Sequence, residues 1–68
     1  MGAILRAFRV ERGLTQEQLA ARARMHRNYV GGVERGEKSP TLKSVGRMLA
    51  VLGVTWTEFG AALDRGRP

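Results

Sequence analysis

The sequence lacks most of the residues from which catalytic and metal sites are built. It contains no cysteine, and His26 is its only histidine. Disulfides, thiolate nucleophiles, Cys-ligated zinc and paired histidine ligands are therefore excluded. Only six residues are acidic, and neither a phosphate-cradling glycine loop nor a zinc-ligand spacing occurs. We therefore expect a binding protein that uses no cofactor and no metal, and not an enzyme.

Long apolar runs are absent as well. No stretch comes near the roughly 20 apolar residues that a membrane-spanning helix needs, so we expect no membrane partner. Residues 1–13 carry charges throughout and have no small-residue cleavage site, which argues against a secretory signal. A chain of 68 residues has room for one small domain, which we place at residues 1–68 and in the cytoplasm.

Positive charge is abundant and clustered. Twelve Lys and Arg residues against six Asp and Glu residues give a net charge of +6. The segment from Arg22 to Arg47 contains seven basic and two acidic residues, so it carries most of this excess. Such clustering is typical of proteins that bind nucleic acid. A basic surface that only keeps the protein in solution is the alternative.

Apolar residues recur at helical spacing, and glycine, proline and threonine residues divide the chain into about five helices. Thr15 and Thr55 are each followed three residues later by Gln or Glu, which predicts capping boxes at the second and fifth helices. Either Ser39 or Thr41 caps the fourth helix. Glycines are expected to end the first, third and fourth helices, at Gly13, Gly36 and Gly53. The fourth helix should bury Leu42, Val45, Leu49 and Leu52. These signals predict an all-α fold with a frayed tail at residues 65–68.

The segment from Gln16 to Val33 has the spacing of a helix-turn-helix. The small residue Ala20 allows close packing of the first of these helices, and a break of about three residues follows. In the next helix Val30 and Val33 face inward. The rotation of 100° per residue then places five residues on the opposite face: Arg27, Asn28, Gly31, Gly32 and Arg35.

The chemistry of this outward face suits base recognition in the major groove. Arg27 offers a fork for guanine O6 and N7, and Asn28 offers an amide for adenine N6 and N7. Both residues stand at the N-terminal end of the helix, which contacts base edges in this motif. Gly31 and Gly32 either let the helix sit deep in the groove or are merely tolerated in a short helix.

Three motifs together resemble a known family. GLTQEQLA, YVGGVERG and SPTL occur in this order, and the chain is similar to the Cro/cI-type (XRE-like) helix-turn-helix family over nearly its whole length. Within that family it most resembles controller proteins of restriction–modification systems. The resemblance implies a compact five-helix, lambda-repressor-like domain of bacterial or phage origin. It also implies a transcriptional regulator that binds a pseudo-palindromic operator on double-stranded DNA as a homodimer.

The resemblance also assigns roles to particular residues. Arg27, Asn28, Gly31 and Gly32 fall where family members read bases, and Gln16 falls where a glutamine contacts a phosphate. Arg9 and Glu34 match an ion pair that joins the first and third helices. The segment after the recognition helix, which lines the DNA backbone in the family, contains Arg35, Lys38, Ser39, Thr41 and Lys43.

Two residues near the turn stand apart from these assignments. The family commonly has glycine after the second helix, whereas this chain has Arg24, so either Arg24 accepts a left-handed backbone or the turn differs. Arg24 is also a candidate phosphate contact. His26 precedes the recognition helix and is expected to donate to a phosphate.

Four apolar residues are not readily accommodated in one monomer core: Met48, Val51, Trp56 and Leu63. They are expected to form a dimer interface, although Trp56 could instead cover the edge of the core. A controller that activates its own operon would also contact RNA polymerase, with Glu17 or Glu37 as candidates. Other functions stay open, namely an antitoxin or a phage-type repressor of the same fold, or a protein-interaction module that does not bind DNA.

Overall fold

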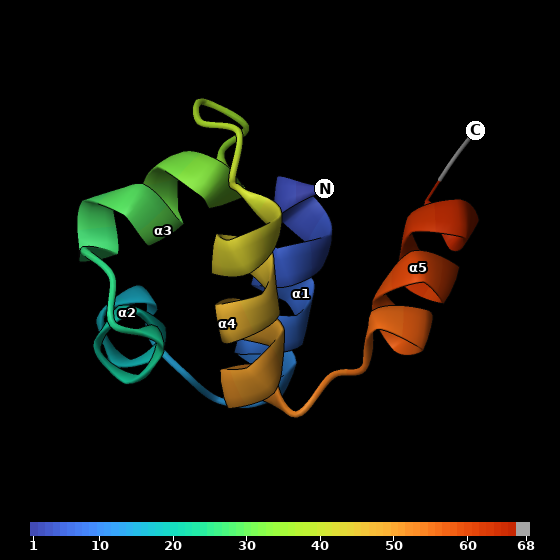
Figure 1. Ribbon diagram of the computed structural model, residues 1–68, viewed down its shortest axis with the longest axis horizontal. Helices are drawn as coiled ribbons and strands as arrows, with labels where there is room; N and C mark the ends of the chain where they lie inside the picture. Colours follow the sequence, from blue (N-terminus) through green and yellow to red (C-terminus); the bar gives the residue numbers. More distant parts are fainter. Residues whose placement is uncertain (67–68) are drawn as a thin grey trace.

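The computed structural model describes residues 1–66. In this range the chain forms five α-helices and no strand, which confirms the predicted all-α class (Figure 1). The helices are α1 (Gly2–Glu11), α2 (Gln16–Ala23), α3 (Arg27–Glu34), α4 (Leu42–Leu52) and α5 (Trp56–Arg65). The expected frayed tail is wrong at position 65, because α5 continues through that residue. Positions 67 and 68 lie outside the described residues.

The helix ends follow the predicted capping signals. Thr15 and Thr55 both form complete capping boxes. The threonine hydroxyl accepts from the backbone N–H of the third helical residue, and the side chain of that residue accepts from the backbone N–H of the threonine. Thr41, not Ser39, caps α4, and its hydroxyl accepts from the Ser44 N–H at 3.1 Å. The glycines expected to end three helices all have positive φ, at Gly13, Gly36 and Gly53. Local sequence therefore sets most of the boundaries.

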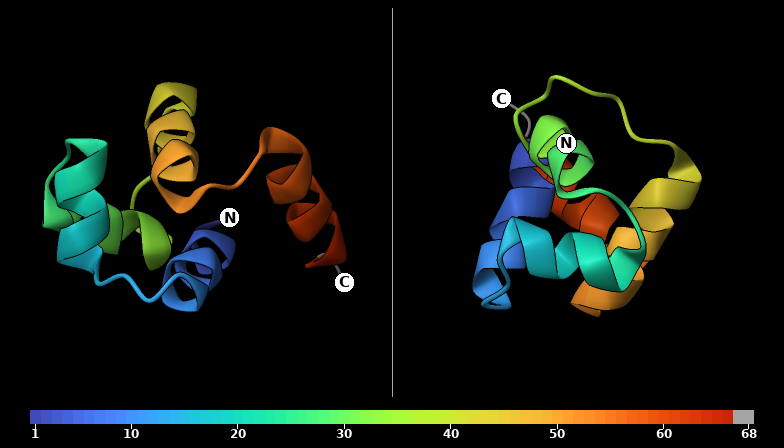
Figure 2. Two further views of the ribbon diagram at one scale, coloured as in Figure 1. Left: turned by 90° about the horizontal axis from the view of Figure 1, so that it is seen from below. Right: turned by 90° about the vertical axis from the view of Figure 1, so that its left-hand side faces the viewer.

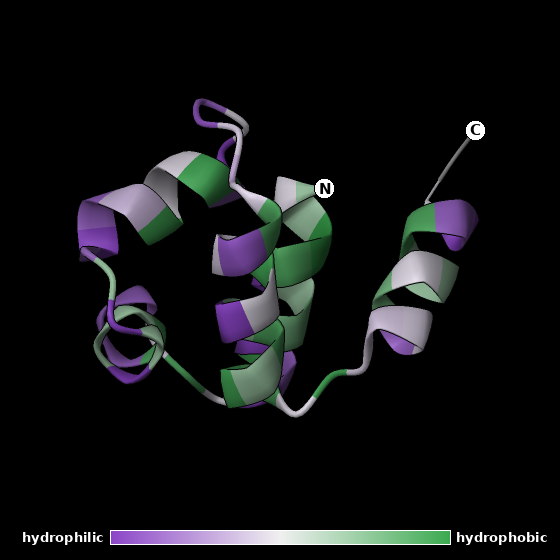
Figure 3. Ribbon diagram, viewed as in Figure 1, coloured by the Kyte–Doolittle hydropathy of each residue, from purple (hydrophilic) through white to green (hydrophobic). Residues whose placement is uncertain are grey.

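The helices enclose one core. Helix α2 contacts α3 and α4, while α1 contacts α3 and α5, and Figure 2 shows α5 on the side of the molecule away from α2 and α3. Every helix contributes to the core, through residues such as Leu5, Leu19, Val30, Leu49 and Phe59. Figure 3 shows hydrophilic residues at the start of α3 and in the α3–α4 loop. Among the described residues, no helix has both the length and the apolar character needed to cross a membrane.

Helix α1 begins directly against the end of α3. A Cβ atom added to Gly2 would lie 2.1 Å from the carbonyl oxygen of Val33 and 2.8 Å from that of Glu34. Any side chain at this position would therefore collide with backbone. The absence of a side chain lets the start of α1 support the C-terminal end of α3.

One predicted core residue is wrong. Leu42 has the spacing of an inward residue of α4, but its exposed fraction is 80%. It is the first residue of the helix, one turn ahead of Gly46. The other three predicted inward residues of α4 are buried, as expected.

Candidate nucleic-acid interface

The turn between α2 and α3 adopts a backbone conformation that is unusual for its sequence. Arg24 has φ 59° and ψ 51°, and it is the only non-glycine with positive φ among residues 1–66. This left-handed conformation costs a residue with a Cβ on the order of 1 kcal/mol. The Met25 N–H donates to the Ala20 carbonyl at 2.9 Å and closes the end of α2. Arg24 thus occupies the family's glycine position and accepts the strain.

His26 caps the start of α3. Its Nδ1 accepts from the backbone N–H of Asn28 at 3.1 Å. A neutral imidazole that accepts at Nδ1 carries its proton on Nε2. His26 is exposed, so this second nitrogen is left as an outward donor beside the recognition helix. The phosphate contact expected of His26 stays a prediction.

A polar groove opens between the N-terminal ends of α2 and α3. It has a volume of about 220 Å³, and its lining consists of Gln16, Glu17, Arg27, Asn28, Gly31 and Arg35. Arg27, Asn28 and Arg35 are exposed, whereas Val30 and Val33 are fully buried on the other side of α3. The predicted division of this helix into an outward face and a core face is confirmed for these residues.

The glycine pair is not on the open surface, which corrects the prediction. Gly31 and Gly32 are both buried. A Cβ on Gly31 would lie 2.9 Å from Arg35 Nη1 and 3.3 Å from Gln16 Oε1. A Cβ on Gly32 would lie 3.0 Å from Lys38 Cδ. Long polar side chains fold over the helix at these positions, so both glycines lie beneath movable surface residues and not within the apolar core.

The segment after α3 presents several polar groups, of which Arg35 lines this groove. Arg35 is paired with Glu37, through Nε to Oε2 at 2.8 Å and Nη2 to Oε1 at 3.2 Å. The Lys38 ammonium lies 6.0 Å from the ring centroid of Tyr29. Ser39, Thr41 and Lys43 are exposed, although the Thr41 hydroxyl also serves as the cap of α4. The pairing with Glu37 uses Nε and Nη2, so Arg35 Nη1 has no hydrogen bond among the described residues.

A buried ion pair fixes the far end of α3, as predicted. Arg9 Nε donates to Glu34 Oε2 at 2.7 Å, and Arg9 Nη2 donates to Oε1 at 2.9 Å. Arg9 Nη1 also donates to the Leu14 carbonyl at 2.8 Å. Gln16 Nε2 donates to Glu34 Oε1 at 3.0 Å. The sequence assigned Gln16 only to a phosphate, so this support of Glu34 is a role that was missed.

The pKa of Glu34 reflects two opposing effects. Burial disfavours the carboxylate and by itself would raise the pKa. Hydrogen bonds from Arg9 and Gln16, together with the positive charge of Arg9, outweigh burial, so the pKa of Glu34 lies below its ordinary value. The carboxylate therefore stays ionised and holds α1, α2 and α3 together.

The four residues expected at a dimer interface do not form one patch. Met48 is wrong as an interface residue because its exposed fraction is 0% and it belongs to the core. Val51 and Leu63 are partly buried, and Val51 lines a groove toward α2. Trp56 alone is largely open, with an exposed fraction of 52%. Its indole packs beside Gly46, where a Cβ would lie 3.3 Å from Cζ2, and edge-on to Phe59.

Comparison with known proteins agrees with this geometry. A helix-turn-helix family model matches residues 5–59. An uncharacterized HTH-type transcriptional regulator of Sinorhizobium fredii is 33% identical over 64 residues, which cover 94% of this chain and 83% of the relative. The chain spans less than half the length of three other relatives that it matches.

Solved structures show the same fold. The restriction-modification controller protein C.Esp1396I superposes with a TM-score of 0.89 at 31% identity, covering 94% of this chain and 84% of that one. The controller protein C.AhdI from Aeromonas hydrophila gives a TM-score of 0.82 at 38% identity, covering 85% and 88%. A further structure contains the C.Esp1396I tetramer in complex with its natural 35-base-pair operator, with a TM-score of 0.87, 31% identity and coverage of 94% and 84%. The relatives are regulators and not enzymes, which confirms that expectation.

Proposed function

We propose that this chain, which belongs to the helix-turn-helix family of transcription regulators, binds double-stranded DNA sequence-specifically as a homodimer. The observation that carries the proposal is the open polar groove at the N-terminal end of α3, with Arg27 and Asn28 exposed beside it. An arginine fork and a carboxamide at that end of a recognition helix match the donor and acceptor patterns of guanine and adenine.

We propose that contacts to DNA phosphates surround the N-terminal end of α3. Gln16 and His26 stand at the N-termini of α2 and α3, where helix dipoles favour an anion. Arg35, Lys38, Ser39, Thr41 and Lys43 follow along the segment after α3. Such contacts fix the register of the protein on DNA, while base contacts supply sequence preference. Gly31 and Gly32 come into contact with DNA only after Arg35 and Lys38 move outward toward phosphates.

The exposed apolar surface around Gly46 is the proposed dimer face. Trp56 covers Gly46, and Leu42 lies one helical turn away on α4. Large exposed apolar residues that lie close together on a small domain are typical of an interaction site. A two-fold axis at this face would present two α3 helices to an inverted repeat, with half-sites about one helical turn apart.

A controller of restriction–modification genes is the regulatory role that we propose. The superposition on controller proteins at 31% and 38% identity supports this role, with an antitoxin or a phage-type repressor as the alternatives. Contact with RNA polymerase would require an exposed patch, for which Glu17 and Glu37 are the candidates. Glu17 and Glu37 are both exposed, but Glu17 lines the groove proposed for DNA and Glu37 is engaged by Arg35.

Selection of bound sites from random duplex DNA tests the function, with the mass of the resulting complex measured in parallel. We expect enrichment of an inverted repeat that is occupied by two chains or a multiple of two. Trp56→Glu should reduce the mass of the free protein to that of one chain. Absence of any enriched sequence would contradict specific binding, whereas an enriched single half-site bound by one chain would contradict the dimer.

A further inference from the structure

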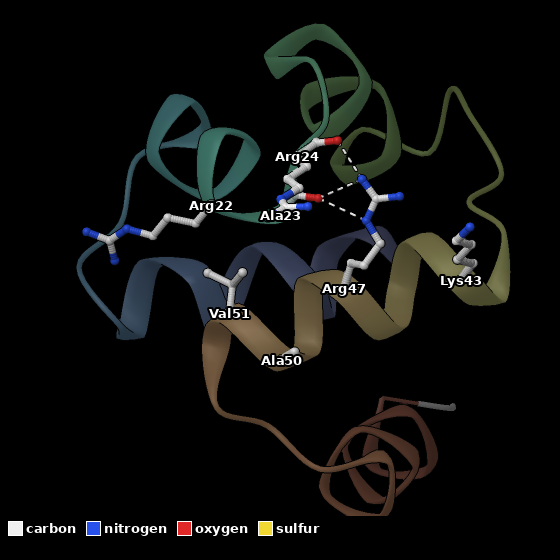
Figure 4. A pocket seen from close by; sticks show the side chains of 7 residues that line it. All are labelled: Arg22, Ala23, Arg24, Lys43, Arg47, Ala50 and Val51. Carbon is white, nitrogen blue, oxygen red and sulfur yellow. Dashed lines mark hydrogen bonds between the residues drawn. The ribbon is translucent and has the colours of Figure 1, made fainter.

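A second groove lies between the C-terminal end of α2 and the side of α4. Its volume is about 490 Å³, and its lining consists of Arg22, Ala23, Arg24, Lys43, Arg47, Ala50 and Val51. Figure 4 shows the Arg47 side chain crossing from α4 to the turn that precedes α3, whereas Arg22 points away from it. Among these basic residues, Arg47 therefore differs in having a specific partner.

Arg47 binds the backbone of the turn through two carbonyl groups. Its Nε and Nη2 donate to the Ala23 carbonyl at 3.0 and 2.8 Å, and Nη2 also donates to the Arg24 carbonyl (Figure 4). The last carbonyls of a helix have no partner within the helix and carry partial negative charge. A guanidinium at this place therefore supplies charge-assisted hydrogen bonds to groups that α2 leaves unsatisfied.

The position of these carbonyls gives Arg47 influence over α3. Arg24 is the strained left-handed residue of the turn, and His26, two residues later, is the cap of α3. The direction in which α3 leaves α2 thus depends on peptide groups that Arg47 holds. With glycine at position 24 the backbone would adopt positive φ without steric cost. The hydrogen bonds from Arg47 to the turn, which we call the Arg47 clamp, would then matter less.

We propose that Arg47 is a positioning residue for DNA recognition. It holds the left-handed turn at Arg24 so that Arg27 and Asn28 meet base edges in the correct geometry, without contacting DNA itself. This inference rests on the proposed sequence-specific binding. It predicts that positions 24 and 47 are coupled, because the hydrogen bonds from Arg47 are needed chiefly when position 24 carries a side chain.

The first experiment compares Arg47→Met with Arg22→Met. Both changes remove one positive charge from the same groove, but for Arg22 the described residues offer no hydrogen bond. Affinity is measured for the selected operator and for a scrambled duplex of equal composition, at a temperature at which circular dichroism shows each variant to be folded. We expect Arg47→Met to lower the ratio of the two affinities about tenfold, and Arg22→Met to leave this ratio unchanged.

The second experiment tests the coupling. In an Arg24→Gly background, Arg47→Met should lower the affinity ratio by about threefold or less. Arg47→Lys, which keeps the charge but loses the planar fork, should give an intermediate loss and serves if Arg47→Met does not fold. An unchanged ratio in the position 47 variants, or an equal loss with Arg24 and with Gly at position 24, would overturn the proposal. A wild-type protein with no preference for any duplex would overturn the proposed function instead.

Discussion

The two ends of α3 are built in opposite ways. At the C-terminal end Glu34 is buried, accepts three hydrogen bonds from Arg9 and Gln16, and lies against the start of α1 at Gly2. At the N-terminal end Arg27 and Asn28 are exposed beside an open groove. Side chains are thus used for cohesion at one end and left available for a ligand at the other.

The difference indicates how a short helix can be held in place at one end while its other end stays open to a ligand. An eight-residue helix has little stability of its own, so its place must be fixed by tertiary contacts. Those contacts are concentrated at the C-terminal end of α3, where no DNA contact is expected. Changes at the C-terminal end should therefore alter folding stability, and changes at the N-terminal end should alter binding alone.

The largest effect is expected from Arg9→Ala. The substitution leaves Glu34 buried without its charged partner and should lower the free energy of unfolding by about 3–5 kcal/mol. Urea denaturation measures this change. The double variant Arg9→Met/Glu34→Leu removes both charges and should lose far less stability. A loss below about 1 kcal/mol for Arg9→Ala would show that the pair does not anchor α3.

Gly2→Ala tests the contact between α1 and the same end of α3. Because the added Cβ would meet the Val33 carbonyl oxygen at 2.1 Å, α1 must shift, and we expect a loss of about 1–3 kcal/mol. Gly60→Ala in α5 is the control, since no atom beyond its neighbours and its own helix backbone lies within 4 Å of its Cβ position. That change should stabilise the protein by up to about 1 kcal/mol. Equal changes in melting temperature for the two variants would contradict the close contact between Gly2 and the Val33 carbonyl oxygen.

A smaller effect is expected from acid. The pKa of Glu34 is lower in the folded chain than its ordinary value of 4.5, so the unfolded chain binds this proton first as pH falls. The stabilisation is therefore complete above the ordinary value and is lost as pH decreases through the folded value. The decrease in unfolding free energy between about pH 7 and about pH 3.5 should be smaller in Arg9→Met/Glu34→Leu than in wild type. An equal decrease would assign acid sensitivity to other carboxylates.

The smallest effect is expected from Lys43→Ala, outside both ends of α3. Lys43 is exposed near the start of α4, so its removal should leave stability unchanged. It should weaken binding to all duplexes alike and reduce the salt dependence of log K by about one unit. Titrations at several salt concentrations give this slope. A changed base preference would mean that Lys43 contacts bases and not phosphate.

The sequence predicted features that depend on local geometry, such as the capping boxes at Thr15 and Thr55. The Arg9–Glu34 pair was expected only from the family resemblance, which also left open whether Arg24 is left-handed or the turn differs. Prediction from the sequence failed where tertiary packing decides whether a residue is buried. Met48 and Trp56 are both apolar and share no local signal that tells core from surface, which depends on how α5 packs.

Long side chains were the other source of error. Burial of Gly31 and Gly32 depends on Gln16, Arg35 and Lys38 folding back over α3, and helical periodicity does not predict those rotamers. The Arg47 clamp was missed for a related reason, because its carbonyl partners lie 23 and 24 residues away in the chain. The assignments of base and phosphate contacts stay predictions.

The central claim is that the N-terminal end of α3 reads base sequence, and binding by Arg27→Ala tests it most directly. Affinities for the selected operator and for scrambled duplex are compared with wild type, with unfolding free energy as the control. We predict a loss of about 1–3 kcal/mol on the operator, relaxed preference at one base pair and unchanged stability. An equal loss on both duplexes would show that Arg27 contacts only phosphate, and would contradict the claim.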